Sequence, residues 1–249
     1  MSKVKKIIIA ALIFVVLAIV AMIPIPYVIE SPGTAEEVSQ FLTISGAKDE
    51  DPGSLRVLTV YVEQATVLTY FKKFLKHHEM VPAEEVFGDY TPEEFDALQE
   101  FSMRNARSKA VRVAFEAAGK TVERHVNGIF VTRVDKSSNF RDKLQVGDII
   151  ETIDGKSLGN TDESFEELRD YLSGLEPGHT LVLQVKRDDA TQTISAQLKM
   201  DSRTGGIRLG FAGEVDEDVT SDPSVEFDPH GVSGPSGGLM FTLEIYNQI

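Results

Sequence analysis

The sequence contains no cysteine. This absence excludes thiol catalysis, disulfide bonds, cysteine-ligated zinc and a lipid anchor on an N-terminal cysteine. Basic residues are also outnumbered, with 25 Lys and Arg against 39 Asp and Glu, for a net charge of −14. Nucleic-acid surfaces need clustered Lys and Arg, so we expect no nucleic-acid partner. Apolar residues make up 42% of the 249 positions, enough to bury the core of one large domain or two smaller ones.

Motifs for common cofactors are missing as well. The phosphate-binding pattern G-x-x-x-x-G-K-[ST] does not occur, so we expect no nucleotide to be used. His77 and His78 are neighbours, but adjacent side chains on a helix point about 100° apart and rarely share one metal ion. The sequence therefore predicts neither a metal nor a cofactor.

The longest apolar run lies at the N-terminus. Lys3, Lys5 and Lys6 precede an unbroken apolar stretch that extends from Ile7 to Ile23. About twenty apolar residues span a bilayer core, and positive charge favours the cytoplasmic side. A cleaved signal peptide is the alternative, but its apolar region is usually about 7–15 residues long and ends in an A-x-A-like site. We expect residues 1–30 to form a cytoplasmic stub and a retained cell-membrane anchor, with the bulk of the chain extracellular.

Residues 31–120 contain one strand pattern and one long helix pattern. The stretch 55–62 is rich in Val and Leu and predicts a strand. The sequence Thr91-Pro92-Glu93-Glu94 is typical of a helix start, and Gly119 is typical of its end. The segment 77–89 between them indicates a loop. We expect this α/β segment to pack with the domain that carries the C-terminal residues.

Residues 121–200 alternate short strands, turns and one amphipathic helix. Strands are predicted at 128–134 and within 144–158, with a short helix at 138–144 between them. A second helix starts at Thr161, with apolar residues three or four positions apart. The last two strands, within 181–198, alternate apolar and polar residues and predict a hairpin. These patterns together predict a compact α+β domain.

This arrangement resembles a PDZ domain of the bacterial protease type. The resemblance is carried by Leu144–Ile150, which read LQVGDII, and by Ile153-Asp154-Gly155. PDZ domains bind a chain end or an extended segment as an added strand beside a helix. The resemblance places their carboxylate-holding loop, whose familiar form is G-L-G-F, at Asn127, Gly128, Ile129 and Phe130. The alternative interpretation is that Gly128 makes a turn and Phe130 fills a core.

Ser236 stands among glycines in the stretch GVSGPSGGLM, which begins at Gly231. Residues 237–249 are mostly apolar, so we expect a largely buried helix with Ser236 at its N-terminus. Free N–H groups and the helix dipole at that end stabilise an oxyanion. They equally suit an ordinary capping serine, which local physics favours over a nucleophile.

Two catalytic patterns compete with the capping interpretation. GPSGG matches the G-x-S-x-G elbow of α/β-hydrolases, but that fold needs several βαβ units before the serine and an Asp and a His after it. The stretch FDPHGVSGPSGGLMFTLEIY, from Phe227, more closely resembles the serine segment of the Lon proteases, whose hallmark is G-P-S-A-G. With the anchor and the PDZ-like region, the order of segments resembles the membrane-anchored, PDZ-containing Lon-like proteases of Gram-positive bacteria.

The resemblance implies that Ser236, and not Ser233, is the nucleophile of a Ser–Lys dyad, with Gly237 in place of the usual alanine. A lysine acts as the base only when burial lowers its pKa toward neutrality. The family places that lysine some tens of residues after the serine, whereas this chain ends at Ile249.

Three other residues are weak candidates for the missing base: Lys186, Lys199 and His230. The dyad lysine is therefore expected beyond this chain, and residues 201–249 are interpreted as the N-terminal part of a Lon-type domain.

The sequence thus predicts an α+β protein with an N-terminal transmembrane helix and a PDZ-like domain inserted before an incomplete Lon-type proteolytic domain. The expected function is that of a membrane-anchored, ATP-independent serine endopeptidase that captures and cleaves extracellular peptides or extended protein tails. The alternative is a catalytically dead peptide-binding scaffold at the membrane. Homo-oligomer formation stays open, because Lon-type domains often form rings.

Overall fold

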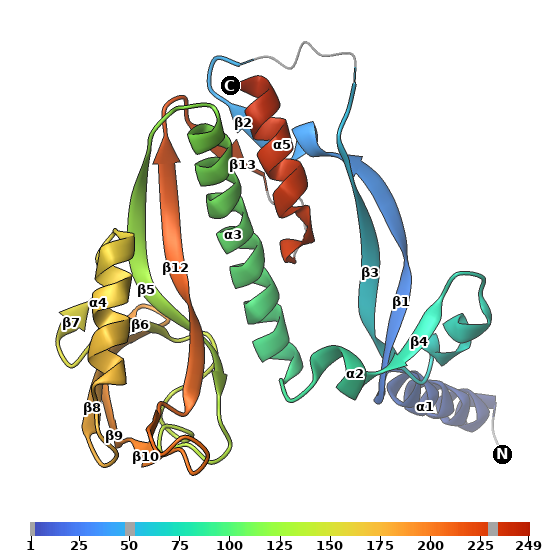
Figure 1. The fold of residues 1–249 in the computed structure, drawn as a ribbon. Helices are drawn as coiled ribbons and strands as arrows, with labels where there is room; N and C mark the ends of the chain where they lie inside the picture. The colour runs from blue at the N-terminus through green and yellow to red at the C-terminus, as the bar shows by residue number, and fades with distance from the viewer. Residues whose placement is uncertain (1–2, 48–52, 229–233) are drawn as a thin grey trace. The chain divides into compact units, whose positions relative to one another are not determined.

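A computed structural model describes residues 3–47, 53–228 and 234–249 (Figure 1). Its residues divide into two compact units. The first unit comprises Met1–Glu36 with Arg56–Pro92, and the second comprises Glu37–Leu55 with Glu93–Ile249. Each unit is therefore assembled from segments that are not consecutive in the sequence.

The first unit starts with the predicted apolar helix, α1 (Lys3–Ala21), none of whose residues is buried. In the part of the chain that the structure describes, α1 is the one helix long and apolar enough to cross a membrane, a property that signal sequences share. The first unit thus begins with an N-terminal apolar helix, as the sequence predicted.

A three-stranded sheet follows α1 in the first unit, in the order β3–β1–β4. Its strands are β1 (Pro24–Glu37), β3 (Arg56–Thr66) and β4 (Glu79–Pro82), accompanied by the short helices η2 (Thr69–Phe74) and α2 (Ala83–Phe87). The prediction of a loop at 77–89 is wrong, because β4 pairs with β1 through Val28 and Val81. Local sequence does not reveal this pairing, since its partner lies about fifty residues away.

The long helix of the second unit, α3 (Pro92–Ala117), has the predicted ends. Gly119 takes a positive φ of 72°, and the Lys120 N–H donates to the Phe115 carbonyl at 2.8 Å. This bond satisfies a carbonyl group that a helix end leaves free, which explains why glycine stops the helix there.

A six-stranded antiparallel sheet forms the centre of the second unit, in the order β12–β5–β6–β8–β9, with β7 paired to β6. Its strands are β5 (Val122–Val134), β6 (Ile149–Ile153), β7 (Lys156–Ser157), β8 (Thr180–Arg187), β9 (Ala190–Gln197) and β12 (Phe211–Ser221). The predicted hairpin is confirmed as β8 and β9. The short helix expected at 138–144 is wrong, because that stretch forms successive turns.

One apolar core lies under this sheet, and helix α4 (Asp162–Ser173) covers part of it. The helix begins with the predicted Thr161, whose side chain accepts from the Ser164 N–H in a capping box. Fully buried members of the core include Val131, Ile150, Leu181 and Leu183. The apolar residues that alternate along the strands therefore point into the core, as predicted.

Strand β12 continues this sheet past residue 200, where the sequence suggested a domain boundary. It pairs with β5 along its full length, from Phe211 opposite Val134 to Ser221 opposite Val122. Before it, β10 (Lys199–Met200) pairs with β11 (Ile207–Arg208). The structure thus joins residues 211–221 to the domain predicted at 121–200.

The chain ends in a small substructure of the second unit. Strand β13 (Val225–Phe227) pairs with β2 (Leu42–Ile44), which follows the short η1 (Val38–Gln40). The short η3 (Pro235–Gly237) leads into the predicted helix, α5 (Gly238–Gln248). Only one face of α5 is buried, through Phe241, Glu244 and Ile245, while Leu239 is 66% exposed. The expectation of a largely buried helix is therefore wrong for its other face.

Candidate functional site

The four residues predicted to hold a carboxylate, Asn127, Gly128, Ile129 and Phe130, lie inside β5 and not in a loop. All but Asn127 have register partners in β12, and Ile129 and Phe130 are also paired with β6. Ile129 and Phe130 lie between two neighbouring strands, where N–H groups are used in the sheet, so the stretch predicted as a loop is a strand. Whether any of them contacts a bound peptide stays a prediction.

Two of these residues have clear structural roles. A Cβ added to Gly128, whose φ is 149°, would lie 2.4 Å from the Ile150 carbonyl oxygen, so only glycine fits there. Phe130 is 6% exposed and stacks on Phe101 of α3. The alternative interpretation therefore holds for Phe130, which fills a core, whereas Gly128 lies in a strand and not in a turn.

The free edge nearest to these residues belongs to β12. This strand stands at one end of the strand order, and no described strand pairs with its outer side. The segment that leads into β12 is Leu209-Gly210-Phe211, which matches the last three letters of the G-L-G-F form. The sequence prediction placed this motif at Asn127–Phe130, at the start of the domain, whereas these three residues follow its other strands.

Gly210 fixes where β12 begins. Its φ is 78°, and its carbonyl accepts a hydrogen bond of 2.9 Å from the Asp135 N–H. An added Cβ would lie 2.4 Å from the Ser138 hydroxyl oxygen. The turn therefore needs glycine, and it holds the start of β12 against the end of β5.

Half-buried apolar side chains lie on both β12 and α4 and pack against the same core. They are Phe211 and Val215 on β12, and Phe165, Leu172 and Leu175 on or just after α4. Side chains of this kind offer apolar contacts to a bound segment while remaining anchored in the fold. The edge of β12 thus combines unpaired backbone groups with apolar surface.

Two neighbouring acidic residues of β12 are buried and paired with arginines. Asp216 and Glu217 are buried, at 3% and 2% exposure. Asp216 accepts from Arg104 of α3 at 3.0 Å, and Glu217 pairs with Arg124 of β5. Because buried carboxylates must be paired, the Arg104–Asp216 contact binds α3 to β12, and the Arg124–Glu217 contact joins β5 to β12.

The two aspartates of the PDZ-like signature are structural. Asp148 is 1% exposed and accepts from Arg187 Nε and Nη2, both at 2.7 Å, and from the Gln145 N–H at 2.8 Å. The hydrogen bonding of Arg187 to Asp148 is the main reason that the pKa of Arg187 is raised. This carboxylate therefore ties the turn before β6 to the end of β8.

Asp154 holds the turn after β6. It accepts from the Tyr171 hydroxyl at 2.7 Å and the Val182 N–H at 2.7 Å, and His179 Nε2 lies 2.8 Å away. Burial alone would raise the pKa of Asp154, but the hydrogen bonds from Tyr171, Val182 and His179 outweigh it and lower that pKa. The group is thus held as a carboxylate at neutral pH.

Ser236 is exposed in η3, one residue before the residue that caps α5. The cap position of α5 is Gly237, with no side-chain hydrogen bond, so the capping interpretation of Ser236 is wrong. Gly234 before it has a φ of 98°, a conformation that favours glycine. Ser236 thus lies on a glycine-rich turn at the N-terminal end of a helix.

No hydrogen bond among the described residues joins Ser236 to a predicted base. Lys186 lies in β8, and Lys199 of β10 donates to the Ser137 carbonyl. His230 and Ser233 lie outside the described residues. Within residues 3–47, 53–228 and 234–249, no cluster of His, Asp and Glu suits a metal ion.

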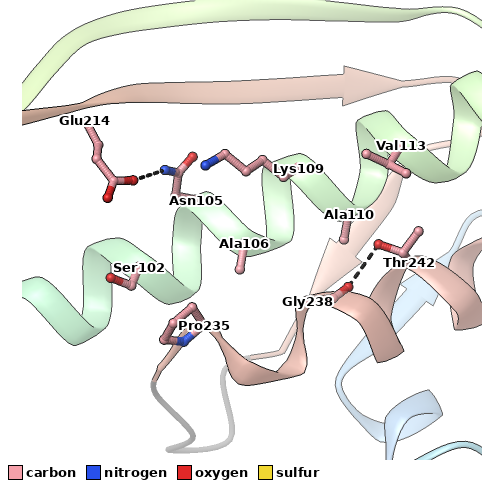
Figure 2. Close-up of a pocket in the computed structure, with 10 residues that line it drawn as sticks. All are labelled: Ser102, Asn105, Ala106, Lys109, Ala110, Val113, Glu214, Pro235, Gly238 and Thr242. Atoms are coloured by element: carbon pink, nitrogen blue, oxygen red, sulfur yellow. Dashed lines mark hydrogen bonds between the residues drawn. The ribbon is translucent and has the colours of Figure 1, made fainter.

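A pocket of about 370 Å³ lies beside the serine turn (Figure 2). Pro235 and Gly238, on either side of Ser236, line it with residues of α3 and with Glu214 and Thr242. The α3 residues are Ser102, Asn105, Ala106, Lys109, Ala110 and Val113. The sequence carries no signal that links α3 to Ser236, because the two are more than a hundred positions apart.

Two features of this pocket are chemically notable. Asn105 is 4% exposed and donates to Glu214 at 3.5 Å, while its Oδ1 has no hydrogen-bond partner among the described residues. Lys109 is the cation of the lining and points along α3 toward Asn105 in Figure 2. The residues that line the pocket therefore include one ammonium group and one buried amide oxygen without a hydrogen-bond partner among the described residues.

Comparison with known proteins identifies part of the chain. Residues 102–198 match the family model of the PDZ domain. The chain therefore contains a PDZ domain, which confirms the resemblance seen in its LQVGDII and IDG segments. The match begins inside α3, so the family pattern reaches further toward the N-terminus than residue 121.

Several solved structures are similar to this region. PDZ domains of SdrC-like proteins from Listeria monocytogenes and Listeria innocua are each 25% identical and cover 35% of this chain, with 87% and 93% of their own chains covered and TM-scores of 0.31. The second domain of a Listeria protein is 22% identical, with 39% of this chain and 86% of that chain covered and a TM-score of 0.28. No curated protein matches the chain.

Proposed function

We propose that the protein binds extended peptide or protein segments by adding them as a strand to the open edge of β12. The carrying observation is that β12 is an edge strand of a sheet whose strands β5, β6, β8 and β9 lie within the residues that match the PDZ family model. Main-chain hydrogen bonds along such an edge supply affinity, and apolar contacts to alternate side chains supply specificity. Phe211 and Val215 of β12 and Leu172 of α4 would provide those contacts.

The charge of β12 supports a preference among peptides. Glu214 and Asp218 are exposed, whereas the neighbouring Asp216 and Glu217 are buried in ion pairs. An acidic segment would be repelled by the exposed carboxylates and by the net charge of −14. The preferred ligand is therefore an extended segment with apolar residues and neutral or basic neighbours.

Hydrogen exchange on the full chain tests this proposal, with a peptide selected from a random-sequence display library as the probe. We expect binding to slow exchange in residues 211–221, while the other edge strand, β9, serves as an internal control. Leu172→Glu should weaken binding, and Ser173→Glu, which adds the same charge at an exposed neighbour, should not. Protection of β9 in place of β12 would refute the proposed edge.

A second candidate function is peptide hydrolysis at Ser236. In this function the helix α1 would anchor the protein to a membrane. The favouring observation is the exposed hydroxyl on a glycine-rich turn at the start of α5, beside a pocket. Ser236 Oγ would attack the peptide carbonyl while a neutral lysine takes its proton; the lysine would pass that proton to the amine that leaves as the C–N bond breaks, and water would then hydrolyse the acyl ester and free Ser236. Lys109 is the lysine that lines this pocket, and a lysine outside the chain is the alternative base.

A fluorophosphonate probe, which labels activated serines, tests the second function. We expect labelling of the full chain and none of Ser236→Ala. If Lys109→Met also abolishes labelling while the protein stays folded, the base lies in α3. Lys109→Arg is the variant that shows whether a change at this position leaves the fold intact. A full chain that binds its selected peptide but takes up no label would leave peptide binding as the function and refute catalysis by this chain.

A further inference from the structure

The segment after β3 is attached to the end of the apolar helix α1. The Val67 N–H donates to the Ile23 carbonyl at 3.1 Å, and the Leu68 N–H donates to the Ala21 carbonyl at 2.9 Å. Ala21 is the last residue of α1. These bonds place the start of η2 at the same level as the C-terminal end of α1, all within the first unit.

This segment exposes an unusual amount of apolar surface. Leu68, Phe71, Phe74 and Leu75 are 63%, 65%, 73% and 55% exposed. Single exposed apolar side chains are ordinary on a protein surface, but four large ones within eight positions form a patch that calls for a partner. None of the residues of η2 itself is buried.

The same segment is basic in an acidic protein. Residues 69–76 read TYFKKFLK, with three lysines and no acidic residue, although the chain carries a net charge of −14. Lys73 Nζ lies 3.7 Å from the centroid of the Tyr70 ring and 5.0 Å from that of Phe74, while Lys72 pairs with Glu63 of β3. Aromatic rings mixed with lysine are typical of the headgroup level of a bilayer, where rings enter the acyl boundary and ammonium groups stay wet.

We infer that residues 67–76 are a second membrane contact, an interfacial surface that lies in the headgroup layer beside α1 and favours anionic lipid. The inference rests on the proposal that α1 is embedded in a membrane. The occupant is lipid and not a protein, because the patch is continuous with the end of α1 through two backbone hydrogen bonds and its charge complements an anionic leaflet. The consequence is that the β3–β1–β4 sheet is held at the bilayer surface and does not swing on a single anchor.

The absence of tryptophan makes a direct test simple, because any Trp introduced is the only one in the full chain. Three single variants are reconstituted in vesicles with and without brominated acyl chains, which quench nearby Trp. Phe74→Trp reports on the patch, and Phe14→Trp reports on α1. Leu58→Trp is the matched control, since Leu58 is 84% exposed on β3, about 26 Å along the strand from Thr66.

We expect brominated chains to quench Phe74→Trp at least about twofold more than Leu58→Trp, and to quench Phe14→Trp most strongly. Replacing Lys72, Lys73 and Lys76 by Gln in the Phe74→Trp background should remove the extra quenching that anionic lipid gives over neutral lipid. Quenching of Phe14→Trp with none of Phe74→Trp would overturn the interfacial surface and leave the anchor intact. An unquenched Phe14→Trp would overturn the anchor itself. A blue-shifted Phe74→Trp without quenching would mean that protein covers the patch, and would also overturn the inference.

Discussion

Phe101 of α3 and Phe130 of β5 stack face to face, with ring centroids 4.0 Å apart and ring planes 6° apart. Both side chains are almost completely buried, at 2% and 6% exposure. The contact joins a helix that the sequence assigned to a separate segment to the sheet of the PDZ domain. Phe130, which the resemblance assigned to ligand binding, therefore anchors α3 to the fold.

Truncation of the Phe130 side chain tests whether this residue serves the core or binds a peptide. We expect Phe130→Ala to lower the free energy of unfolding by about 3–5 kcal/mol, because it opens a cavity beneath Phe101. Guanidinium unfolding in detergent, followed by tyrosine fluorescence, measures the change. Leu239→Ala, at a residue that is 66% exposed on α5, should stay within about 0.5 kcal/mol. A stable Phe130→Ala protein that no longer binds peptide would restore the ligand-contact interpretation.

The Asp148–Arg187 pair gives a second prediction. Asp148→Ala leaves a largely covered guanidinium without its two 2.7 Å hydrogen bonds, so we expect a loss of about 3–5 kcal/mol. Asp189→Ala, at the exposed hairpin turn between β8 and β9, is the matched control and should have little effect. Equal midpoints of thermal unfolding for the two variants would show that the pair contributes nothing.

Asp154 makes stability depend on pH in a defined direction. Its pKa is lowered in the folded protein, so its contribution is complete above the unfolded value of about 3.9 and is lost as pH falls through the folded pKa. Asn suits the positive φ of 49° at this position, so Asp154→Asn removes the charge without straining the turn. The stability difference between wild type and Asp154→Asn should be largest near pH 6 and shrink below about pH 4. A difference that is constant over this range would contradict the assignment.

Gly237 distinguishes this chain from the G-P-S-A-G form. An added Cβ would lie 2.9 Å from Cε2 of the Phe241 ring, which is itself packed edge-on against Phe41 and Phe227. We expect Gly237→Ala to destabilise the protein by about 1–3 kcal/mol, because the ring has little room to move. The variant Gly237→Ala with Phe241→Leu should recover part of that loss. A more stable Gly237→Ala protein would show that reduced backbone freedom of the unfolded chain outweighs the contact.

Several features of the fold could be predicted from neighbouring residues alone. The ends of α3, the capping box at Thr161, the turn at Asp154-Gly155 and the β8–β9 hairpin all depend on residues only a few positions apart. Their chemistry is local, because a cap or a tight turn is satisfied by the backbone groups beside it. The PDZ signature and the apolar N-terminal helix were visible for the same reason.

The candidate sites depended on contacts between distant residues. Pairing of β12 with β5, as in Val215 opposite Ile129, turned the predicted loop at Asn127–Phe130 into an inner strand and left β12 as the open edge. Packing of α3 against α5, where Ala106 faces Gly238, brought Asn105 and Lys109 to the pocket beside Ser236. Strand order and helix packing are decided by which apolar surfaces are buried together, and that choice involves residues a hundred positions apart. The sequence alone therefore determined which elements form and which family the domain resembles, whereas the tertiary structure decided which backbone edge and which side chains are available to a ligand.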